Sequence, residues 1–324
     1  MPRESLVQGN AASTAAVILN YRTPRETIRA VRSLSELHGA SVRIVVVDNA
    51  SGDGSPAMLA GDLPGIDLVC ASHNGGFSAG CNLGIRRALE TGARRVLLLN
   101  SDAVARPEML PALEGALDAD ARLGIVGPLV LSLADPDCVQ SAGISYSMGT
   151  ARMRHNDVNV RRSATDALST RIVDGVSGCA MLIRREVFER IGLFAEEYFF
   201  GFEDLDYCLR ARGAGFLTAC VGGASVLHEG NLSIGRTSKL RAYFAARNHL
   251  LLAARFGRPF PLLRWARMAN VLALNLAFVA TTSELARREG LAGFASGVRD
   301  YFAGRFGAAE GGTNNRGEDA VSTR

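Results

Sequence analysis

The stretch Val42-Arg-Ile-Val-Val-Val-Asp48 decides the fold of this 324-residue chain. Its β-branched residues predict a buried strand. The apolar run Ala15–Tyr21 predicts an earlier strand, and Pro24 with Glu26 opens a helix over about 24–37 between the two. Strand, helix and strand in this order begin a parallel α/β sheet, in which ligands lie beyond the carboxyl ends of the strands.

Polar residues stand at the ends of these two predicted strands. Asn20 and Tyr21 follow the first strand, and Asp48 follows the second. Asp48 could accept a hydrogen bond from the N3–H group of a uracil or thymine ring. Its alternative role is that of a turn-forming aspartate in a loop. The sequence therefore predicts a nucleotide site at this edge of the sheet.

A glycine-rich junction comes next, after a third predicted strand over 66–71. It runs from Asn74 to Gly84 and precedes a predicted helix over 85–91. Such a junction is a natural site for a diphosphate against free N–H groups, and Asn74, Gly76 and Asn82 are the predicted donor contacts. Its glycines do not follow the G-x-G-x-x-G pattern, so a dinucleotide dehydrogenase fits poorly.

The next predicted strand, 95–102, ends in three polar residues: Asn100, Ser101 and Asp102. An acid at a strand end can hold Mg²⁺ or Mn²⁺ against a phosphate, since these cations prefer hard oxygen ligands. Asp102 stands too far before Pro107 to cap the helix predicted over 107–119. We expect a long connection with short hairpin strands over 132–171, which could hold acceptor determinants.

An acidic stretch, Tyr198–Arg210, follows a strand predicted over 173–183. It places Glu203, Asp204 and Asp206 after a run of aromatic residues. Carboxylates among aromatics need a charged, metal or hydrogen-bonding partner when buried, which favours a catalytic site. The alternative is a helix N-terminus, where acids favour the macrodipole.

Bulk composition excludes several classes of protein. A net charge of +4 does not indicate a nucleic-acid binder, and the only lysine, Lys239, is not in a P-loop. The six cysteines form no C-x-x-C pair, so we expect reduced thiols in a cytosolic protein. Residues 1–13 contain no apolar core of a secretory signal.

The C-terminal part is rich in arginine and aromatic residues. Its apolar run, Ala269–Ala280, is too short to span a bilayer, but the segment could lie in a membrane interface; the alternative is a pair of ordinary packing helices. We divide the chain into a disordered leader (1–13), a main domain (14–255), a helical extension (256–307) and a disordered tail (308–324).

Five segments together resemble the family 2 inverting glycosyltransferases with a GT-A fold, a Rossmann-like, mostly parallel sheet flanked by helices. The likeness covers about 14–255 and is greatest to bacterial rhamnosyltransferases. The segments are Val17–Tyr21, Val45–Ser51, Asn74–Gly84, Leu97–Asp102 and Phe202–Arg210.

The resemblance implies specific roles. Asp48 is similar to the family's pyrimidine-contacting acid, and Asp204 to its general base. Asp102 matches the second acid of the D-x-D element that binds Mg²⁺ or Mn²⁺, whereas Asn100 replaces the first. His228 resembles the family's metal-contacting histidine. The remaining predicted substrate contacts are Asn20, Tyr21, Asn74, Gly76, Asn82, Ser101 and Glu203.

The expected activity is transfer of a sugar, L-rhamnose from dTDP-rhamnose, to a hydroxyl of a glycan or polyprenyl-linked acceptor in cell-envelope polysaccharide synthesis. We expect the protein in the cytoplasm or at the inner face of the plasma membrane. The alternatives are another sugar (glucose, galactofuranose or N-acetylglucosamine) and a non-catalytic nucleotide-sugar-binding protein, which the Asn100 departure favours. A nucleotidyltransferase ranks lower, because Asn20–Pro24 is not glycine-rich.

Overall fold

The computed structural model describes residues 13–35, 42–164, 169–230, 238–257, 260–281 and 284–309. The predicted leader and tail lie almost entirely outside these ranges, so both stay predictions, as does the division of the chain at residue 255.

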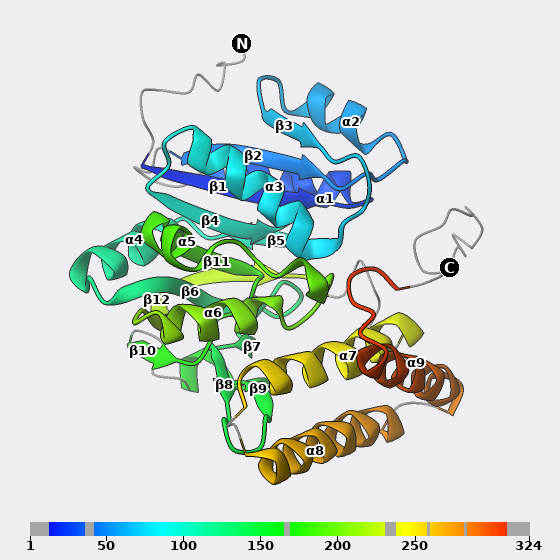
Figure 1. Cartoon of the computed structure of the whole chain (residues 1–324). Coiled ribbons are helices and arrows are strands. Elements are labelled where there is room, and N and C mark those ends of the chain that lie inside the picture. Colours follow the sequence, from blue (N-terminus) through cyan, green and yellow to red (C-terminus); the bar gives the residue numbers. More distant parts are fainter. Residues whose placement is uncertain are drawn as a thin grey trace.

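A parallel half-sheet contains the fold-deciding strands (Figure 1). Its strand order is β3-β2-β1-β4, and the register pairs Asn20 with Asp48 and Leu19 with Asn100. The carboxyl ends of β1, β2 and β4 therefore meet at one edge, as predicted. The elements are β1 (Thr14–Asn20), α1 (Pro24–Ser35), β2 (Val42–Asp48), α2 (Ser55–Asp62), β3 (Asp67–Cys70), α3 (Gly76–Glu90) and β4 (Arg95–Asn100).

The other half of the sheet is mixed. Strand β11 lies antiparallel between β4 and β6, β12 runs parallel to β6, and β10 closes this edge. The elements are β5 (Ala103–Ala105), α4 (Met109–Ala119), β6 (Leu123–Ser132), β7 (Val139–Ser141), β10 (Thr170–Val173), β11 (Ala180–Arg184), α5 (Arg185–Ile191), η2 (Glu196–Tyr198), α6 (Glu203–Gly213) and β12 (Leu217–His228).

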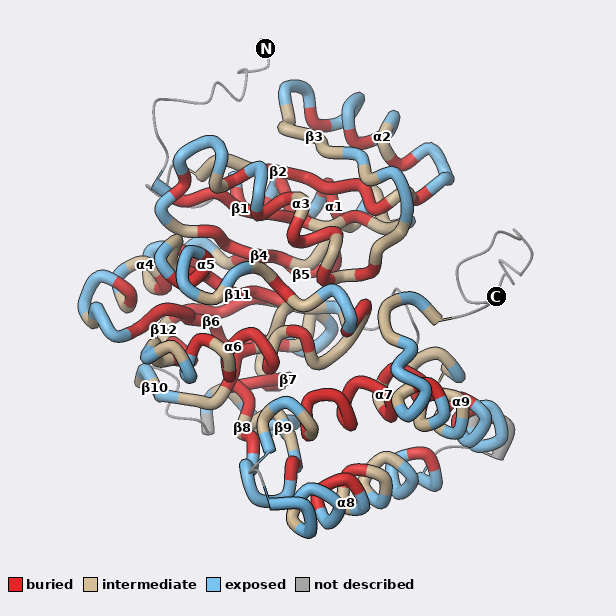
Figure 2. The backbone as a smooth tube through the Cα atoms, viewed as in Figure 1, coloured by how far each residue is buried: buried red, intermediate tan, exposed pale blue. Residues whose placement is uncertain are grey.

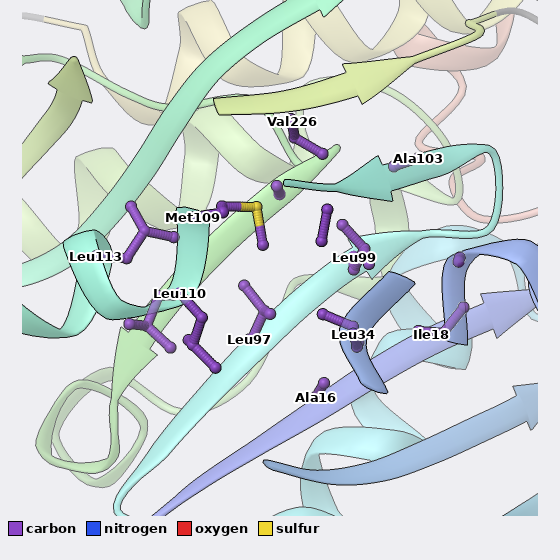
Figure 3. Close-up of a cluster of buried hydrophobic side chains, with 14 of the residues drawn as sticks. Ala16, Ile18, Leu34, Leu97, Leu99, Ala103, Met109, Leu110, Leu113 and Val226 are labelled. Atoms are coloured by element: carbon purple, nitrogen blue, oxygen red, sulfur yellow. The ribbon is translucent and has the colours of Figure 1, made fainter. Parts of the chain in front are cut away.

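Helices cover both faces of the sheet, because alternate residues of each central strand point to opposite sides. Ala16 and Ile18 of β1 pack with α1 and α4 on one face, whereas Val17 packs with α3 on the other. Figure 3 shows the first cluster, in which Leu34, Leu97 and Met109 meet side chains from several elements. Figure 2 shows these strands as an almost continuous buried layer. The packed sheet therefore holds the carboxyl ends of β1, β2 and β4 in fixed positions.

Three predicted boundaries were wrong. Helix α3 begins at Gly76 rather than at residue 85, because its glycines let it approach β1: a Cβ atom on Gly84 would lie 2.3 Å from Cγ1 of Val17. Strand β11 begins only at Ala180, and 174–179 forms a turn before it. Helix α6 begins at Glu203, so the acids occupy its first turn.

The predicted long connection over 132–171 does contain short strands. Besides β7 and a 3-10 turn, η1 (Arg162–Ala164), it forms a two-stranded hairpin of β8 (Ile144–Tyr146) and β9 (Met153–His155). The hairpin lies between α6 and the C-terminal helices (Figure 1).

The C-terminal part consists of α7 (Lys239–Arg255), α8 (Pro261–Ala280) and α9 (Glu284–Phe302). Helix α8 corrects the expectation of a short apolar run, because its 20 residues are long and apolar enough to cross a membrane by length and composition alone. It lies at the end of the molecule opposite β3 and α2 (Figure 1).

Candidate active site

A closed hydrogen-bond cluster occupies the edge formed by β1 and β2. The Asn20 amide donates to Oδ1 of Asp48 over 2.7 Å and to the Ser51 hydroxyl over 3.1 Å. Ser51 donates its hydroxyl to Oδ1 of Asp48 over 2.6 Å and its N–H to Oδ2 over 3.1 Å. All three residues are buried, so Asp48 is held rigidly, with one lone pair of Oδ2 left for a ligand. Tyr21, half-buried at the end of β1, lies beside them.

The junction at the start of α3 does not offer the free N–H groups that the sequence predicted. The N–H of Gly76 donates to Oδ1 of Asn74, and that of Phe77 donates to the carbonyl of Phe199. Gly76 has a φ of +82°, and a Cβ atom there would lie 2.4 Å from the Phe199 oxygen. Protein acceptors thus occupy the N–H groups of Gly76 and Phe77, and Gly76 permits close packing with Phe199; a diphosphate against this helix start stays a prediction.

Asn82 is likewise a packing residue in this structure. It is 1% exposed, and its amide donates to the carbonyl of Phe194 over 3.0 Å and to Oε1 of Glu196 over 2.9 Å. Its Oδ1 accepts the N–H of Phe194 over 3.0 Å. The side chain makes these hydrogen bonds to the segment that leads to the acidic stretch, and the substrate contact at Asn82 stays a prediction.

The end of β4 stays partly open. Asn100 and Ser101 are both half-buried, and the hydroxyl of Thr23 donates to that of Ser101 over 3.1 Å. The N–H of Asn100 donates to the carbonyl of Cys179 over 2.8 Å. The backbone is thus anchored, while the Asn100 amide remains at the edge beside Asp102.

Asp102 and His228 form a compact acid–imidazole pair. Their Oδ1 and Nε2 atoms lie 3.3 Å apart, and Oδ2 of Asp102 accepts the N–H of Gly230. Gln140 contacts the other ring nitrogen of His228 through Oε1, at 3.0 Å, which fixes the ring. The sequence placed these two residues 126 positions apart; strands β5 and β12 pair Ala103 with His228 and bring them together.

Electrostatics reinforce this pair. Burial would raise the pKa of Asp102, but the hydrogen bond and charge of His228 hold it below its usual range. Burial would lower the pKa of His228, but the neighbouring Cys179 and Asp102 raise it to about 11. In the ligand-free protein the pair is therefore an ion pair, and His228 must release its proton before it can bind a metal.

The donor set fits a divalent cation that is shared with a substrate. The Oδ1 atom of Asp102 and the Nε2 atom of His228 lie 3.3 Å apart, and Asn100 stands two residues before Asp102 in the chain. Among the described residues, no group of three or more His, Cys, Asp and Glu side chains could hold a metal ion. Mg²⁺ and Mn²⁺ are often bound by one or two protein ligands together with substrate phosphates and water, so this pair fits such an ion.

Asp204 is the accessible acid of the three in the acidic stretch. It is half-buried in the first turn of α6, where Oδ2 accepts the N–H of Gly178 over 2.9 Å and Oδ1 accepts the N–H of Leu205 over 2.8 Å. These two bonds fix the plane of the carboxylate and leave a lone pair on each oxygen. The carboxylate can therefore accept a proton from a hydroxyl group.

The neighbouring acids have different environments. Asp206 is 0% exposed and binds the Tyr198 hydroxyl, Arg210 and Arg255, which makes it a structural ion-pair centre. Glu203 is 6% exposed, and its Oε2 has no hydrogen-bond partner among the described residues. Burial and the charge of Asp204 raise the pKa of Glu203 to about 8, so this carboxyl is mostly neutral at pH 7.

The turn 177–179 connects the acid–imidazole pair to Asp204. Its Gly178 N–H binds Asp204, its Cys179 carbonyl binds the end of β4, and the Cys179 thiol interacts with His228. The strand predicted over 173–183 includes these residues, so their role as a connecting turn was not predicted. No signal in the sequence marks this turn, since a Cβ atom at Gly178 would lie at an ordinary contact distance, 3.4 Å, from that of Asp204.

Helix α7 holds the aromatic loop that precedes Asp204. The amide of Asn248 donates to the carbonyls of Tyr198, Phe200 and Gly201 over 2.7, 2.9 and 3.0 Å. The ring of Phe202 stacks on His249 at 4.9 Å between centroids. The C-terminal helices thus position the loop from which the base emerges.

His155 is a further residue of the site that the sequence analysis missed. It lies on β9, and its Nδ1 is 2.9 Å from the hydroxyl of Ser141. Burial lowers the pKa of His155, and the charge of Asp204 opposes this shift, so the two are electrostatic neighbours. No motif marks this histidine, because the long connection that carries it has no sequence periodicity.

Curated relatives include two rhamnosyltransferases. The chain is 26% identical to the dTDP-rhamnosyl transferase RfbF of Shigella flexneri over 73% of this chain and 78% of the relative. It is 27% identical to the N-acetylglucosaminyl-diphospho-decaprenol L-rhamnosyltransferase of Mycobacterium tuberculosis over 85% of this chain and 95% of the relative.

Solved structures of similar fold are GT-A glycosyltransferases. The mannosyltransferase PcManGT of Pyrobaculum calidifontis, in complex with GDP-Man and Mn²⁺, gives a TM-score of 0.54 at 17% identity over 90% of this chain and 87% of that one. The S. aureus TarS 1–349 in complex with UDP gives 0.52 at 14% identity over 90% and 91%. The predicted GT-A fold with C-terminal helices is confirmed.

A family model covers most of the chain. The model described as glycosyltransferase like family 2 matches residues 11–249, which extend from the first strand through most of α7. With the ordered strand ends, the acid–imidazole pair and Asp204 on α6 in place, the chain belongs to the family 2 glycosyltransferases.

Proposed function

We propose that this glycosyltransferase is an inverting, metal-dependent L-rhamnosyltransferase that uses dTDP-L-rhamnose. The observation that carries the proposal is the placement of Asp204. Gly178 holds this carboxylate on the same turn that contacts the end of β4 and His228. Asp204 and the acid–imidazole pair are thus both connected to one short turn, which supports a shared site.

The mechanism requires a base on one face of the sugar and a leaving diphosphate on the other. Asp204 would accept the proton of the acceptor hydroxyl as its oxygen attacks C1 of the sugar, while the bond from C1 to the diphosphate breaks. Its two N–H donors keep the carboxylate aimed during this transfer. Glu203 and Asp206 do not serve as bases, because one is buried and mostly neutral and the other is ion-paired.

Asp102 and His228 would hold a Mg²⁺ or Mn²⁺ ion, whose charge neutralises the departing diphosphate. Asp48 would bind the pyrimidine through Oδ2, with Tyr21 beside the ring. Asn100 and Ser101 would lie at the ribose and diphosphate. Asn74, whose Oδ1 accepts N–H groups of Asn49 and Gly76, and Glu203, whose Oε2 has no partner among the described residues, would be further substrate contacts.

The relatives support the choice of sugar and acceptor. One is named for dTDP-rhamnosyl transfer, and the other for transfer to an N-acetylglucosaminyl-diphospho-decaprenol. We therefore propose a lipid-linked glycan acceptor in cell-envelope polysaccharide synthesis, used at the inner face of the plasma membrane. The solved neighbours bind GDP-Man and UDP, so other donors belong in the test.

The test is turnover of a donor panel with a water-soluble, short-chain analogue of the diphospholipid acceptor. We expect release of dTDP from dTDP-L-rhamnose in the presence of Mn²⁺, loss of release in EDTA, and a product of inverted anomeric configuration by NMR. The control variant is Asp118→Asn, because that side chain is 64% exposed and pairs with Arg95 at the other end of β4. Release of nucleotide from a different donor alone would mean that the enzyme transfers another sugar. A product of retained anomeric configuration would overturn the inverting mechanism.

A further inference from the structure

Helix α8 carries an exposed apolar stripe. Eight exposed residues lie on one face, at spacings of three and four along the helix. They are Leu262, Trp265, Ala266, Ala269, Ala273, Leu276, Ala277 and Ala280. Leu262 is 87% exposed, and Trp265 is 61% exposed. From Leu262 to Ala280 the stripe is about 27 Å long.

The polar residues of α8 point the other way, into the protein. Arg267 is 2% exposed and donates to the carbonyls of Met148 and Ala253 and to the Tyr146 hydroxyl. Helix α8 thus has an apolar outer face and polar residues on its inner face, the reverse of a surface helix in water. This arrangement favours an apolar medium outside the helix.

Two asparagines continue this inner face. Asn270 donates to the carbonyl of Thr150 over 2.7 Å, and Asn275 contacts Nδ1 of His249 at 3.1 Å. Together with Arg267 they attach α8 lengthwise to α7 and to the turn of the β8–β9 hairpin.

This attachment decides how α8 can meet a bilayer. Met268, Val271 and Val279 are buried along the same inner face, so α8 is bound to protein from its first turns to its last. A spanning orientation would place Arg267, Asn270 and Asn275 in lipid without their partners. The helix can instead lie in the plane of the interface with only its outer stripe in the acyl region.

Charge around the stripe favours an anionic surface. Helix α8 contains no acidic residue, and Arg264 is exposed on it. Segment 256–307 has seven arginines and three acidic residues. Arg152 and Arg154 line a hollow of about 340 Å³ with Ser145 and Thr150, on the same hairpin whose turn α8 holds.

We propose that the outer stripe of α8 docks this enzyme flat on an anionic lipid bilayer, with the hairpin turn at the membrane surface. The inference deepens the proposed function, on which its biological meaning rests, because the same hairpin carries His155, which contacts Ser141 and whose charge interacts with that of Asp204. A lipid-linked acceptor would thus enter from the membrane side beside the base, without leaving the bilayer.

The protein carries its own reporter for this test. Trp265 is the only tryptophan of the chain and lies in the stripe. With the full-length protein, we expect a blue shift of its emission when vesicles of phosphatidylglycerol and phosphatidylcholine are added, and quenching by lipids brominated in the acyl chain. A smaller shift is expected with pure phosphatidylcholine, since electrostatic attraction is then absent.

The variants Leu262→Ser and Leu276→Ser, combined, keep Trp265 and remove apolar area from the stripe. We expect the vesicle partition coefficient in flotation assays to fall at least about tenfold. The matched control is Ile172→Ser, because Ile172 is 58% exposed on β10, outside the C-terminal helices. Its partition coefficient should equal that of the wild type.

Three results would overturn the docking proposal. They are absence of vesicle binding, equal binding by the stripe variant, and a blue shift that depends on protein concentration without vesicles, which would assign the stripe to a second copy of the chain. Turnover of the water-soluble acceptor analogue separates the two proposals: the stripe variant should retain it. If the wild type binds vesicles but turns over no donor, the proposed function fails while the docking surface stands.

Discussion

Two groups of polar residues near the same edge of the sheet differ in how far other protein atoms satisfy their hydrogen bonds. The first group, Asn20, Asp48, Ser51 and Asn82, is buried and almost wholly satisfied by the protein itself. The second group is Asp102, His228 and Asp204, in which the two carboxylates keep unused lone pairs and His228 lies between Asp102 and Gln140.

The difference separates residues that mainly stabilise the site from residues that can take part in the reaction. Residues whose hydrogen bonds are complete stabilise the strand ends, whereas residues with unused acceptors can bind a cation or accept a proton. Each group contains an aspartate that follows an apolar strand, Asp48 or Asp102, and only the structure distinguishes the two. Substitutions in the two groups should therefore have different effects on activity, stability and cation affinity.

The largest effect is expected for Asp204→Asn. The amide oxygen can still accept the Gly178 N–H, so the fold should persist, but the side chain can no longer take up a proton. We expect kcat to fall about 10³- to 10⁴-fold with an unchanged Tm. Steady-state release of nucleotide diphosphate measures this; a fall below tenfold would assign the base to another residue.

Glu203→Gln tests the neutral acid beside the base. Burial raises its pKa from 4.5 to about 8, so the folded state binds a proton that the unfolded state releases. The wild type therefore loses stability as pH rises from about 4.5 to 8. The variant should gain up to about 4 kcal/mol in unfolding free energy relative to wild type between pH 4 and pH 9.

Denaturant unfolding at several pH values measures this difference. The control is Glu189→Gln, since that side chain is 61% exposed on α5 and should show no such trend. A constant difference between wild type and Glu203→Gln at all pH values would mean that Glu203 is ionised in the folded protein.

Asn82→Ala tests the closed group. Truncation leaves the N–H and carbonyl of Phe194 without their partner in a buried site. We expect a loss of about 2–3 kcal/mol in unfolding free energy. The KM for the donor should stay within about twofold, because no substrate group is lost. A raised KM with an unchanged Tm would establish Asn82 as a substrate contact.

The fold could be predicted because its signals are local. The β-branched run of β2 and the apolar run of β1 are buried on both faces, and few other structures accommodate such runs. The boundaries of α3 and β11 were wrong for one reason: glycines at these positions permit close packing between elements. A close approach depends on the partner, which the sequence of one segment does not reveal.

The site could be predicted in part. Strand ends and the acidic stretch point to Asp102 and Asp204, because each carboxylate follows an apolar or aromatic run. Gly178 and His155 could not be found this way, since both act through partners far along the chain. Likewise, the sequence alone could not distinguish Asn82, with its bonds completed, from Asn100, whose amide remains at the open edge.

The smallest effect is expected for Asn100→Asp, which tests whether the side chain at position 100 faces the cation. The change adds a carboxylate beside Asp102, at the position where related enzymes carry the first acid of the D-x-D element. Hard cations gain affinity with each added carboxylate. Asn100 is half-buried, so solvent screens the new charge, and we expect Mn²⁺ to bind about fivefold more tightly in the presence of dTDP.

Calorimetric titration of Mn²⁺ measures this affinity, with the wild-type protein as the reference and Asn74→Asp as the matched control. Asn74 lies on the closed side, where its Oδ1 accepts N–H groups of Asn49 and Gly76. A carboxylate there has no route to the cation, so its Mn²⁺ affinity should not change. Equal gains for both variants would mean that the cation responds to net charge alone, and that Asn100 does not face it.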